Sequence, residues 1–201
     1  MPDSLSRYRE RRNPRRSGEP SGGRTSRGRR GKPRFVVQQH DATGMHFDFR
    51  LESSGVLKSW AVPRGPSLDP GDKRLAMPTE DHPLGYAGFE GVIPEGEYGA
   101  GPVIVWDRGT YDNETEGSPG QPIDLDEAIE RGHVRVRLHG RKLRGGYALT
   151  RMGGRGRQRC LLVKTADEFA AGHGRSAEPR PESVKSGKTI EQMAAGRRRS
   201  P

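Results

Sequence analysis

The chain has 201 residues, a length typical of one domain, and it combines a formal net charge of +10 with a hydrophobic content of only 29%. Its single cysteine, Cys160, excludes an internal disulfide, and the surrounding CLLVK favours a small buried side chain over a nucleophile. No segment approaches membrane-spanning length and the first residues lack an apolar signal-peptide stretch, so a cytoplasmic protein without membrane contact is expected.

Charge divides the chain into two basic ends and a nearly neutral middle. Residues 1–32 carry a net charge of +8 and residues 172–201 carry +4, whereas residues 33–171 carry −2. Both ends are rich in Arg, Gly, Ser and Pro, a composition typical of disorder. The sequence therefore predicts one folded domain at 33–171 between disordered basic tails, which would attract nucleic acid without reading its sequence.

The middle is predicted to consist mainly of short strands. Apolar runs bounded by turn residues indicate strands near 35–40, 45–52, 56–62, 102–107, 133–139, 145–151 and 159–164. A short helix is expected at 124–132, and TADEFAAG is a candidate for a second. The glycine-rich stretch 85–101 should form a shaped loop. This pattern is typical of a mainly β fold, a barrel or a sandwich.

The stretch VVQQHDATGMHFDFRLE (36–52) contains the strongest functional signal. From Met45 apolar and polar residues alternate, so His46, Asp48 and Arg50 project from one face of a strand. In one register with the preceding strand, His40 joins Met45 on the apolar face. In the other, His40 lies opposite His46. The second register keeps the imidazole out of the core and is preferred. It gathers on one surface Gln38, His40, His46, Asp48 and Arg50.

Two imidazoles and one carboxylate suit a borderline divalent cation such as manganese, iron or zinc. Arg50 does not ligate a metal and would hold an anion beside it. The alternative is a solvated polar face of an amphipathic strand. The second histidine in register and the neighbouring arginine favour the metal site over that alternative.

A strongly basic stretch follows an acidic one near the end of the domain. Residues 111–130 contain seven acids and no Lys or Arg, whereas residues 131–164 contain eleven Lys and Arg and no acid. Alternation at 134–139 turns outward Arg135, Arg137 and His139. This strand is a candidate phosphate-contacting surface, the alternative being a charged face in solvent. Because aromatic residues make up only 6% of the chain, backbone contacts are expected to dominate over base recognition.

Known motifs for other chemistries are missing from the sequence. There is no P-loop, no Gly-x-Ser-x-Gly and no Cys-x-x-Cys, which excludes nucleotide hydrolysis at a Walker site and zinc-finger binding.

Four long stretches carry a resemblance to a known family: RFVVQQHDATGMHFDFRLE, GVLKSWAVPRGPSLDPGDKRLAM, EDHPLGYAGFEGVIPEGEYGAGPVIVWDRGTY and RLHGRKLRGGYALTRM. From about residue 34 to 169 the chain resembles the 3′-phosphoesterase domain of bacterial DNA ligase D. The resemblance implies a compact closed β-barrel with an open hydrophilic active site. It also implies a manganese-dependent DNA repair enzyme of end joining. Such enzymes remove a 3′-terminal ribonucleoside from DNA or RNA–DNA strands to leave a 3′-phosphate, then remove that phosphate to leave a 3′-OH.

The resemblance also implies roles for individual residues. The metal ligands would be His40, His46 and Asp48. Around the scissile phosphate it places Arg50, Arg64, Arg74, His82 and Tyr86. Supporting substrate contacts would come from Gln38, Glu80, Arg12 and Glu19. His82 could bind a phosphate oxygen or protonate the leaving group, and the sequence leaves both roles open.

Two positions depart from the family pattern. Arg64 stands where members often have lysine, which keeps a cation but changes its geometry. In YRERRNPRRSGEP, Asn13 replaces an acid, which bears on the ribonucleoside-removing step. The ligase and polymerase modules of larger members are not in this sequence, so a monomer working beside separate ligase, polymerase and Ku-type proteins is expected.

Two rival functions remain at the level of the sequence. A His-x-Asp pair with a distant histidine, His82 or His133, also describes a non-haem iron oxygenase. Such an enzyme needs an apolar substrate pocket, whereas arginines crowd this site. A non-catalytic protein that binds DNA ends would bind in the presence of a chelator and release no phosphate.

Overall fold

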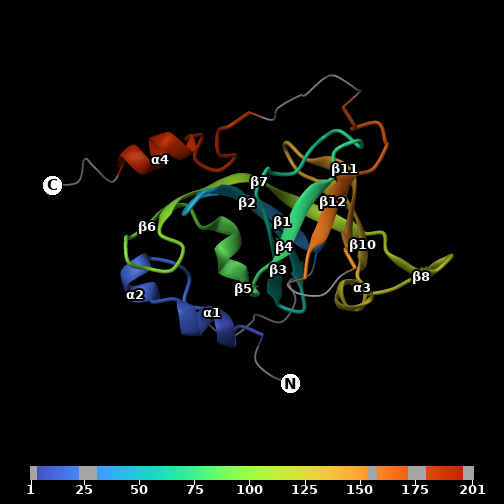
Figure 1. Cartoon of the computed structure of the whole chain (residues 1–201), viewed down its shortest axis with the longest axis horizontal. Helices are drawn as coiled ribbons and strands as arrows, with labels where there is room; N and C mark the ends of the chain where they lie inside the picture. Colours follow the sequence, from blue (N-terminus) through green and yellow to red (C-terminus); the bar gives the residue numbers. More distant parts are fainter. Residues whose placement is uncertain (1–3, 23–30, 154–157, 172–179, 197–201) are drawn as a thin grey trace.

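The computed structural model describes residues 4–22, 31–153, 158–171 and 180–196, and it shows a closed β-barrel (Figure 1). Hydrogen-bonded pairing between the first and last strands of the ring closes the barrel. In ring order the eight strands are β1 (Arg34–Asp41), β2 (Met45–Ser53), β3 (Val56–Val62), β4 (Arg74–Pro78), β12 (Cys160–Lys164), β11 (Arg144–Arg151), β10 (His133–His139) and β7 (Gly101–Asn113). The predicted mainly β fold and the closed barrel are confirmed.

Smaller elements surround the ring. The short strands are β5 (His82–Pro83), which pairs with β3, β6 (Gly91–Ile93), which pairs with β7, and the hairpin β8 (Glu116–Ser118) with β9 (Gln121–Pro122). The helices of the described residues are α1 (Ser6–Arg11), α2 (Pro14–Ser17), the 3-10 helix η1 (Leu84–Gly88), α3 (Leu125–Arg131) and α4 (Ile190–Gly196). None of these helices is long and apolar enough to cross a bilayer.

Two hydrophobic clusters lie on opposite faces of β1–β3. The larger cluster fills the barrel and includes Phe35, Phe49 and Trp60. The smaller one lies outside the barrel, where Val36 and Leu57 meet Tyr86 and the N-terminal Leu5 and Tyr8. Because successive strand residues point to opposite faces, the same three strands serve both clusters. The outer face, which is not committed to the barrel core, is therefore available for a site.

The ends of the chain contain ordered elements where the sequence predicted disorder. Residues 4–22 form α1 and α2, and Leu5 and Tyr8 are at most 1% exposed. Residues 180–196 contain α4, which packs on β7. The average composition of these segments hides the few apolar residues that anchor them. Of the remaining tail residues, 31–32 are described and lead into β1, and the others lie outside the described part of the chain.

Two local predictions differ from the structure. TADEFAAG (165–172) is not a helix over its described residues, 165–171. There the Asp167 carboxylate accepts hydrogen bonds from the Lys164 ammonium and from the backbone N–H groups of Gly146 and Phe169. These contacts form a turn directly after β12, which ends at Lys164. Within the expected loop 85–101, residues 84–88 form η1 and residues 91–93 form β6. Strand β4 was not predicted.

Gly101, the first residue of β7, allows the tip of the β1–β2 hairpin to approach closely. Its φ is +140°, and an added Cβ would lie 1.9 Å from the carbonyl oxygen of Asp41. We expect Gly101→Ala to lower the free energy of unfolding by about 2 kcal/mol, because backbone must move to relieve the overlap. Chemical denaturation measures this change.

The matched control is Gly44→Ala on the same hairpin, where an added Cβ would have no neighbour within 4 Å. Its stability should stay within about 0.5 kcal/mol of the wild-type value. Equal stability of the Gly101→Ala and Gly44→Ala variants would contradict the close approach of β7 to the hairpin.

Candidate metal and phosphate site

The register of the β1–β2 hairpin is the one preferred from the sequence. His40 pairs with His46, and Gln38 pairs with Asp48. Asp41 pairs with Met45, so the connection is the short turn at 42–44. Since paired residues share a face, the two histidines and Asp48 project together from the outer face of the barrel.

The three predicted ligands converge. The Asp48 Oδ2 atom lies 3.7 Å from His40 Nδ1 and 3.8 Å from His46 Nε2. One ligand atom from each of the three residues lies within 4.8 Å of the others. Among the described residues this is the only such group of His, Cys, Asp or Glu, so neither His82 nor His133 completes a facial triad. We call His40, His46 and Asp48 the ligand cluster.

Backbone carbonyls orient both imidazoles of the ligand cluster. His40 Nε2 lies 2.8 Å from the Gly99 carbonyl oxygen, and His46 Nδ1 lies 2.9 Å from that of Gly44. A ring nitrogen facing a carbonyl carries the proton, so the other nitrogen of each ring presents a lone pair toward Asp48. This tautomer arrangement is the one a metal-binding histidine needs. The residues present therefore fit a divalent cation.

Arg50 contacts the ligand cluster and also holds polar side chains of two neighbouring strands. Its guanidinium is 3.1 Å from Asp48 Oδ2, donates to Gln38 Oε1 at 2.9 Å and donates to Ser59 Oγ at 2.8 Å. Burial by itself raises the pKa of Asp48, but Arg50 and the two neighbouring imidazoles outweigh it and hold that pKa well below its usual range. Asp48 is therefore ionised at neutral pH.

His82, on β5, lies between two guanidinium groups. Its Nδ1 is 2.8 Å from both the Arg50 side chain and the Glu80 carbonyl oxygen, and its Nε2 is 3.4 Å from Arg12. Burial lowers the pKa of His82 well below its usual value, and the nearby Arg50 lowers it further. The ring is therefore neutral at physiological pH.

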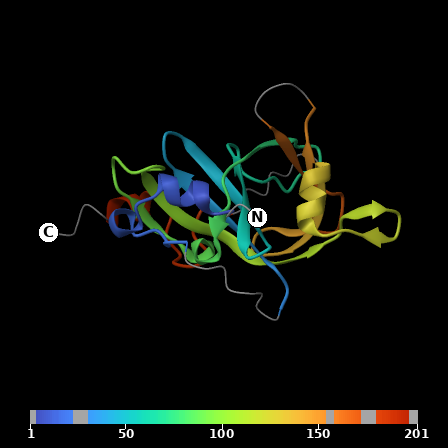
Figure 2. The ribbon, with the colours of Figure 1, turned by 90° about the horizontal axis from the view of Figure 1, so that it is seen from below.

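The N-terminal segment, residues 4–22, brings charged groups to the same site. Arg12 lies 3.1 Å from Glu19 Oε1 and 2.9 Å from Glu80 Oε1. Tyr86 donates its hydroxyl to Glu19 at 2.9 Å, and Tyr8 packs edge-on against His82. Figures 1 and 2 show α1 and α2 together at one end of the molecule, whereas α3 and the β8–β9 hairpin lie at the other.

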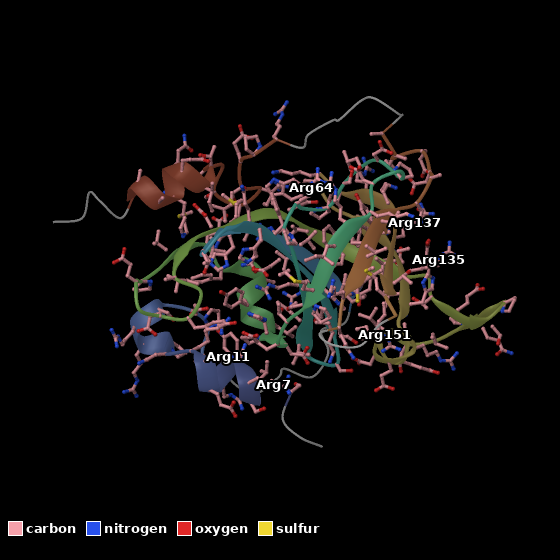
Figure 3. The ribbon with its side chains drawn as sticks, viewed as in Figure 1. Arg7, Arg11, Arg64, Arg135, Arg137 and Arg151 are labelled. Atoms are coloured by element: carbon pink, nitrogen blue, oxygen red, sulfur yellow. The ribbon has the colours of Figure 1, made fainter. Side chains whose placement is uncertain are left out.

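The remaining two predicted cations, Arg64 and Arg74, form no hydrogen bond or ion pair with the ligand cluster among the contacts of the described residues. Arg64 is exposed, and Figure 3 places it well away from Arg7 and Arg11 of α1. Arg74 forms an ion pair with Asp72 at 2.6 Å. In the strand register Arg74 pairs with Leu162, on the barrel-core face, whereas Asp48 projects from the outer face.

The basic strand β10 is already neutralised along part of its outer face. Arg137 lies 2.7 Å from Glu114, and His139 lies 2.7 Å from Asp112. The cause is the pairing of β10 with β7, which sets the acidic stretch beside the basic one. Figure 3 shows Arg135, Arg137 and Arg151 at the end of the molecule away from α1. The phosphate-contacting surface expected here is therefore not a row of free cations.

Sequence reasoning missed several residues of the site. Ser59 holds Arg50, and the carbonyl groups of Gly44 and Gly99 orient the histidines. A serine in a strand or a glycine in a loop carries no signal of such a role. Contacts of this kind depend on tertiary structure.

Comparison with known proteins gives a consistent family. The family model described as the DNA Ligase D 3′-phosphoesterase domain matches residues 38–151. The chain is 47% identical over 196 residues to "Multifunctional non-homologous end joining protein LigD" of Pseudomonas aeruginosa, covering 94% of this chain and 22% of that protein. It is 51% identical over 120 residues to the LigD protein of Mycobacterium tuberculosis (strain H37Rv), covering 60% of this chain and 15% of that protein.

The LigD protein of Mycolicibacterium smegmatis is 44% identical over 122 residues, covering 61% of this chain and 16% of that protein. The chain thus spans less than a quarter of the length of these relatives. The family model matches more than half of the chain, and the match to the Pseudomonas relative is nearly complete over this chain. The chain belongs to the family of DNA ligase D 3′-phosphoesterase domains.

Proposed function

We propose that this protein is a metal-dependent phosphoesterase that restores 3′ ends of DNA for end joining. In the first reaction water would displace the 5′ oxygen of a terminal ribonucleoside at phosphorus and leave a 3′-phosphate. In the second, water would cleave the remaining 3′ phosphoester and release inorganic phosphate. The observation that supports this most is the ligand cluster, whose ligand atoms lie within 4.8 Å of one another beside Arg50.

His40, His46 and Asp48 would hold the cation. Two nitrogens with one carboxylate oxygen suit manganese, iron or zinc, and manganese is the ion that we propose. When bound, the cation would polarise a phosphate oxygen and lower the pKa of water. Both histidines must be neutral to serve as ligands, so activity should be lost at acid pH.

Arg50 would neutralise charge that develops on the phosphate. A guanidinium whose position is fixed by Gln38 and Ser59 needs little rearrangement in the transition state. Charge-assisted contacts with phosphate oxygens are about twice as strong as neutral hydrogen bonds. Gln38 thus acts by positioning, and its amide in turn donates to the backbone of Tyr86 and Phe89.

His82 is proposed to bind a phosphate oxygen or the leaving-group oxygen as a neutral hydrogen-bonding group. Its lowered pKa argues against an imidazolium that waits to donate a proton. Tyr86 and Glu80 would hold His82, Arg12 and Glu19 in place. Glu19 Oε2 is buried and has no hydrogen-bond partner among the described residues, and a ribose hydroxyl is the donor we propose for it.

Arg64 and Arg74 are proposed to contact strand phosphates outside the ligand cluster. Arg64 is exposed and available, whereas Arg74 would first have to leave Asp72. Ligase, polymerase and Ku-type end-binding proteins are the proposed partners of a cytoplasmic monomer, because a restored 3′-OH is the group that ligation and strand extension consume.

The decisive experiment uses a 5′-labelled duplex that carries one 3′-terminal ribonucleotide. With manganese we expect a product ending in 3′-phosphate, followed by one ending in 3′-OH, as resolved by denaturing electrophoresis. Excess chelator should prevent both products. Binding of the duplex without any manganese-dependent product would instead support a non-catalytic DNA-end binder.

A further inference from the structure

Tyr98 is an exposed aromatic side chain that the proposed function does not use. Among the exposed large hydrophobic residues of the described chain it is the only aromatic one, and it is 50% exposed. Tyrosine is intermediate in its tendency to be buried, so this exposure alone is not a functional signal. What distinguishes Tyr98 is its position next to Gly99, which contacts the ligand cluster.

The loop that carries Tyr98 also contacts the ligand cluster. The next residue, Gly99, accepts the hydrogen bond of His40 Nε2 at 2.8 Å. The loop is tied to α2 through the ion pair of Arg16 with Glu97 at 3.0 Å. Tyr98 thus lies between Glu97, which is paired with Arg16 of α2, and Gly99, which contacts His40.

Arginines of the N-terminal segment fix the Tyr98 ring itself. The Arg12 guanidinium lies 4.5 Å from the ring centroid, and Arg11 donates to the hydroxyl at 3.2 Å. The Arg11 guanidinium also lies 5.2 Å from the ring centroid, so both arginines are close to the ring. Tyr98 is nevertheless 50% exposed, which leaves part of its surface for a base to stack on. The ring is therefore oriented before any ligand binds, which reduces the entropy lost on binding.

The exposure of the ligand cluster decides which nucleotide lies near Tyr98. The His46 side chain is 23% exposed and follows the exposed hairpin tip, whereas the His40 side chain is 10% exposed under the Tyr98 loop. A DNA strand continues away from its terminus and must leave on the open side, which is that of His46. The side of His40 is the less open one, so the terminal nucleoside, which has no continuation, is the group that we assign to it.

We propose that Tyr98 stacks on the base of the 3′-terminal nucleoside, the group released in the first of the two reactions, an inference that rests on the proposed function. Stacking on an aromatic ring accepts any base, because every base has a π face. The contact would select for a complete nucleoside at the terminus without selecting its sequence. Tyr98 is in this sense a positioning residue for the leaving group.

The test compares Tyr98→Ala with wild type on three duplexes, which end in a ribonucleotide, in a ribose without base, or in a 3′-phosphate. For the first duplex we expect kcat/KM of nucleoside release to fall by about tenfold. The other two should react as with wild type, because they offer no terminal base. Tyr98→Phe keeps the ring and loses only the Arg11 contact to the hydroxyl, so it should retain most of the wild-type rate. Met152→Ala, at an exposed apolar residue directly after β11, is the matched control.

Two outcomes would overturn the proposal. If Tyr98→Ala slows all three duplexes alike and weakens manganese binding, the residue acts only through Gly99 on His40. If it slows none of them, the ring makes no contact with the substrate.

A measurement without turnover separates this inference from the proposed function. A duplex ending in a 2-aminopurine ribonucleotide is bound in the presence of chelator, and its fluorescence is recorded. Stacking quenches this base, so wild type and Tyr98→Phe should quench it and Tyr98→Ala should not. Quenching by the wild-type protein without manganese-dependent cleavage would support stacking by Tyr98 and contradict the proposed phosphoesterase function. Cleavage of the duplex, with equal fluorescence for wild type and Tyr98→Ala, would support the phosphoesterase function and contradict stacking by Tyr98.

Discussion

Replacing His46 with alanine is expected to lower both 3′-end reactions by at least about a hundredfold while the barrel remains folded. Even partners that only orient a metal ligand cost about 10- to 100-fold when removed, so loss of a ligand itself should cost more. His46 suits the test because its side chain is 23% exposed and its other nitrogen contacts only the carbonyl of Gly44 in the same turn. Its removal leaves no buried charge unpaired.

The measurement has two parts, the rate of product formation and the affinity for manganese by calorimetry. His133→Ala is the matched control, because His133 is exposed on β10 and contacts Thr150 instead of the ligand cluster. Asp48→Ala should abolish activity as well. Near-normal turnover of the His46→Ala protein, with its manganese affinity unchanged, would remove the ligand assignment.

Local patterns in the sequence predict most of the barrel. Strands β3 (Val56–Val62) and β10 (His133–His139) have the predicted bounds. Strand β2 (Met45–Ser53) is one residue longer than the predicted range 45–52. The alternation of apolar and polar residues is sufficient there, because one face is buried in the core. The register of His40, preferred because it keeps an imidazole out of the core, is also the one observed.

Features that depend on distant segments were not predicted. Strand β4 (Arg74–Pro78) has only Ala76 fully buried, and of its two partners, β3 and β12, the second lies more than eighty positions along the chain. The N-terminal segment reads as a basic tail, yet Tyr8 docks it onto His82 and Tyr86. The pairing of Arg12 with Glu80 crosses a comparable separation. Composition describes such segments on average, whereas a few anchor residues determine where they lie.

In the ligand cluster, too, the local arrangement was predicted from the sequence, whereas the contacts from distant segments were not. The spacing of His46 and Asp48 on one strand places them side by side, and this was apparent from alternation alone. What the spacing does not reveal is how each side chain is held, since Gly99 and Ser59 come from other elements. The chemistry of the site is therefore local in sequence, but its preorganisation is not.

Replacing Arg50 with methionine should lower the free energy of unfolding of the metal-free protein by about 3–5 kcal/mol at neutral pH. The Arg50 side chain is 3% exposed and its partner Asp48 is 9% exposed, so the substitution leaves an ionised carboxylate in a buried position. Gln38 and Ser59 also lose the donor that they share. Activity should be lost too, because the proposed phosphate contact disappears.

The destabilisation should depend on pH in a defined direction. In the wild-type protein the folded pKa of Asp48 lies below its unfolded value, so its contribution to stability is present above the unfolded pKa and lost as the pH falls through the folded one. Without Arg50, burial raises the pKa of Asp48. Protonation of Asp48 then removes the buried charge that destabilises the folded state. The difference in stability between wild type and Arg50→Met should therefore begin to narrow as the pH falls through the raised Asp48 pKa of the variant, above the unfolded value of about 4, and should continue to narrow toward the lowered folded pKa of the wild type.

Urea unfolding followed by tryptophan fluorescence at several pH values, with chelator present, measures both effects. Arg135→Met, at an exposed position on β10, is the matched control and should change stability by no more than about 0.5 kcal/mol. The double variant Arg50→Met/Asp48→Leu should regain much of the lost stability, because a buried pair replaced by apolar groups costs far less than a pair with one partner removed. A double variant as unstable as Arg50→Met would mean that the hydrogen bonds to Gln38 and Ser59, and not the charge of Asp48, account for the contribution of Arg50.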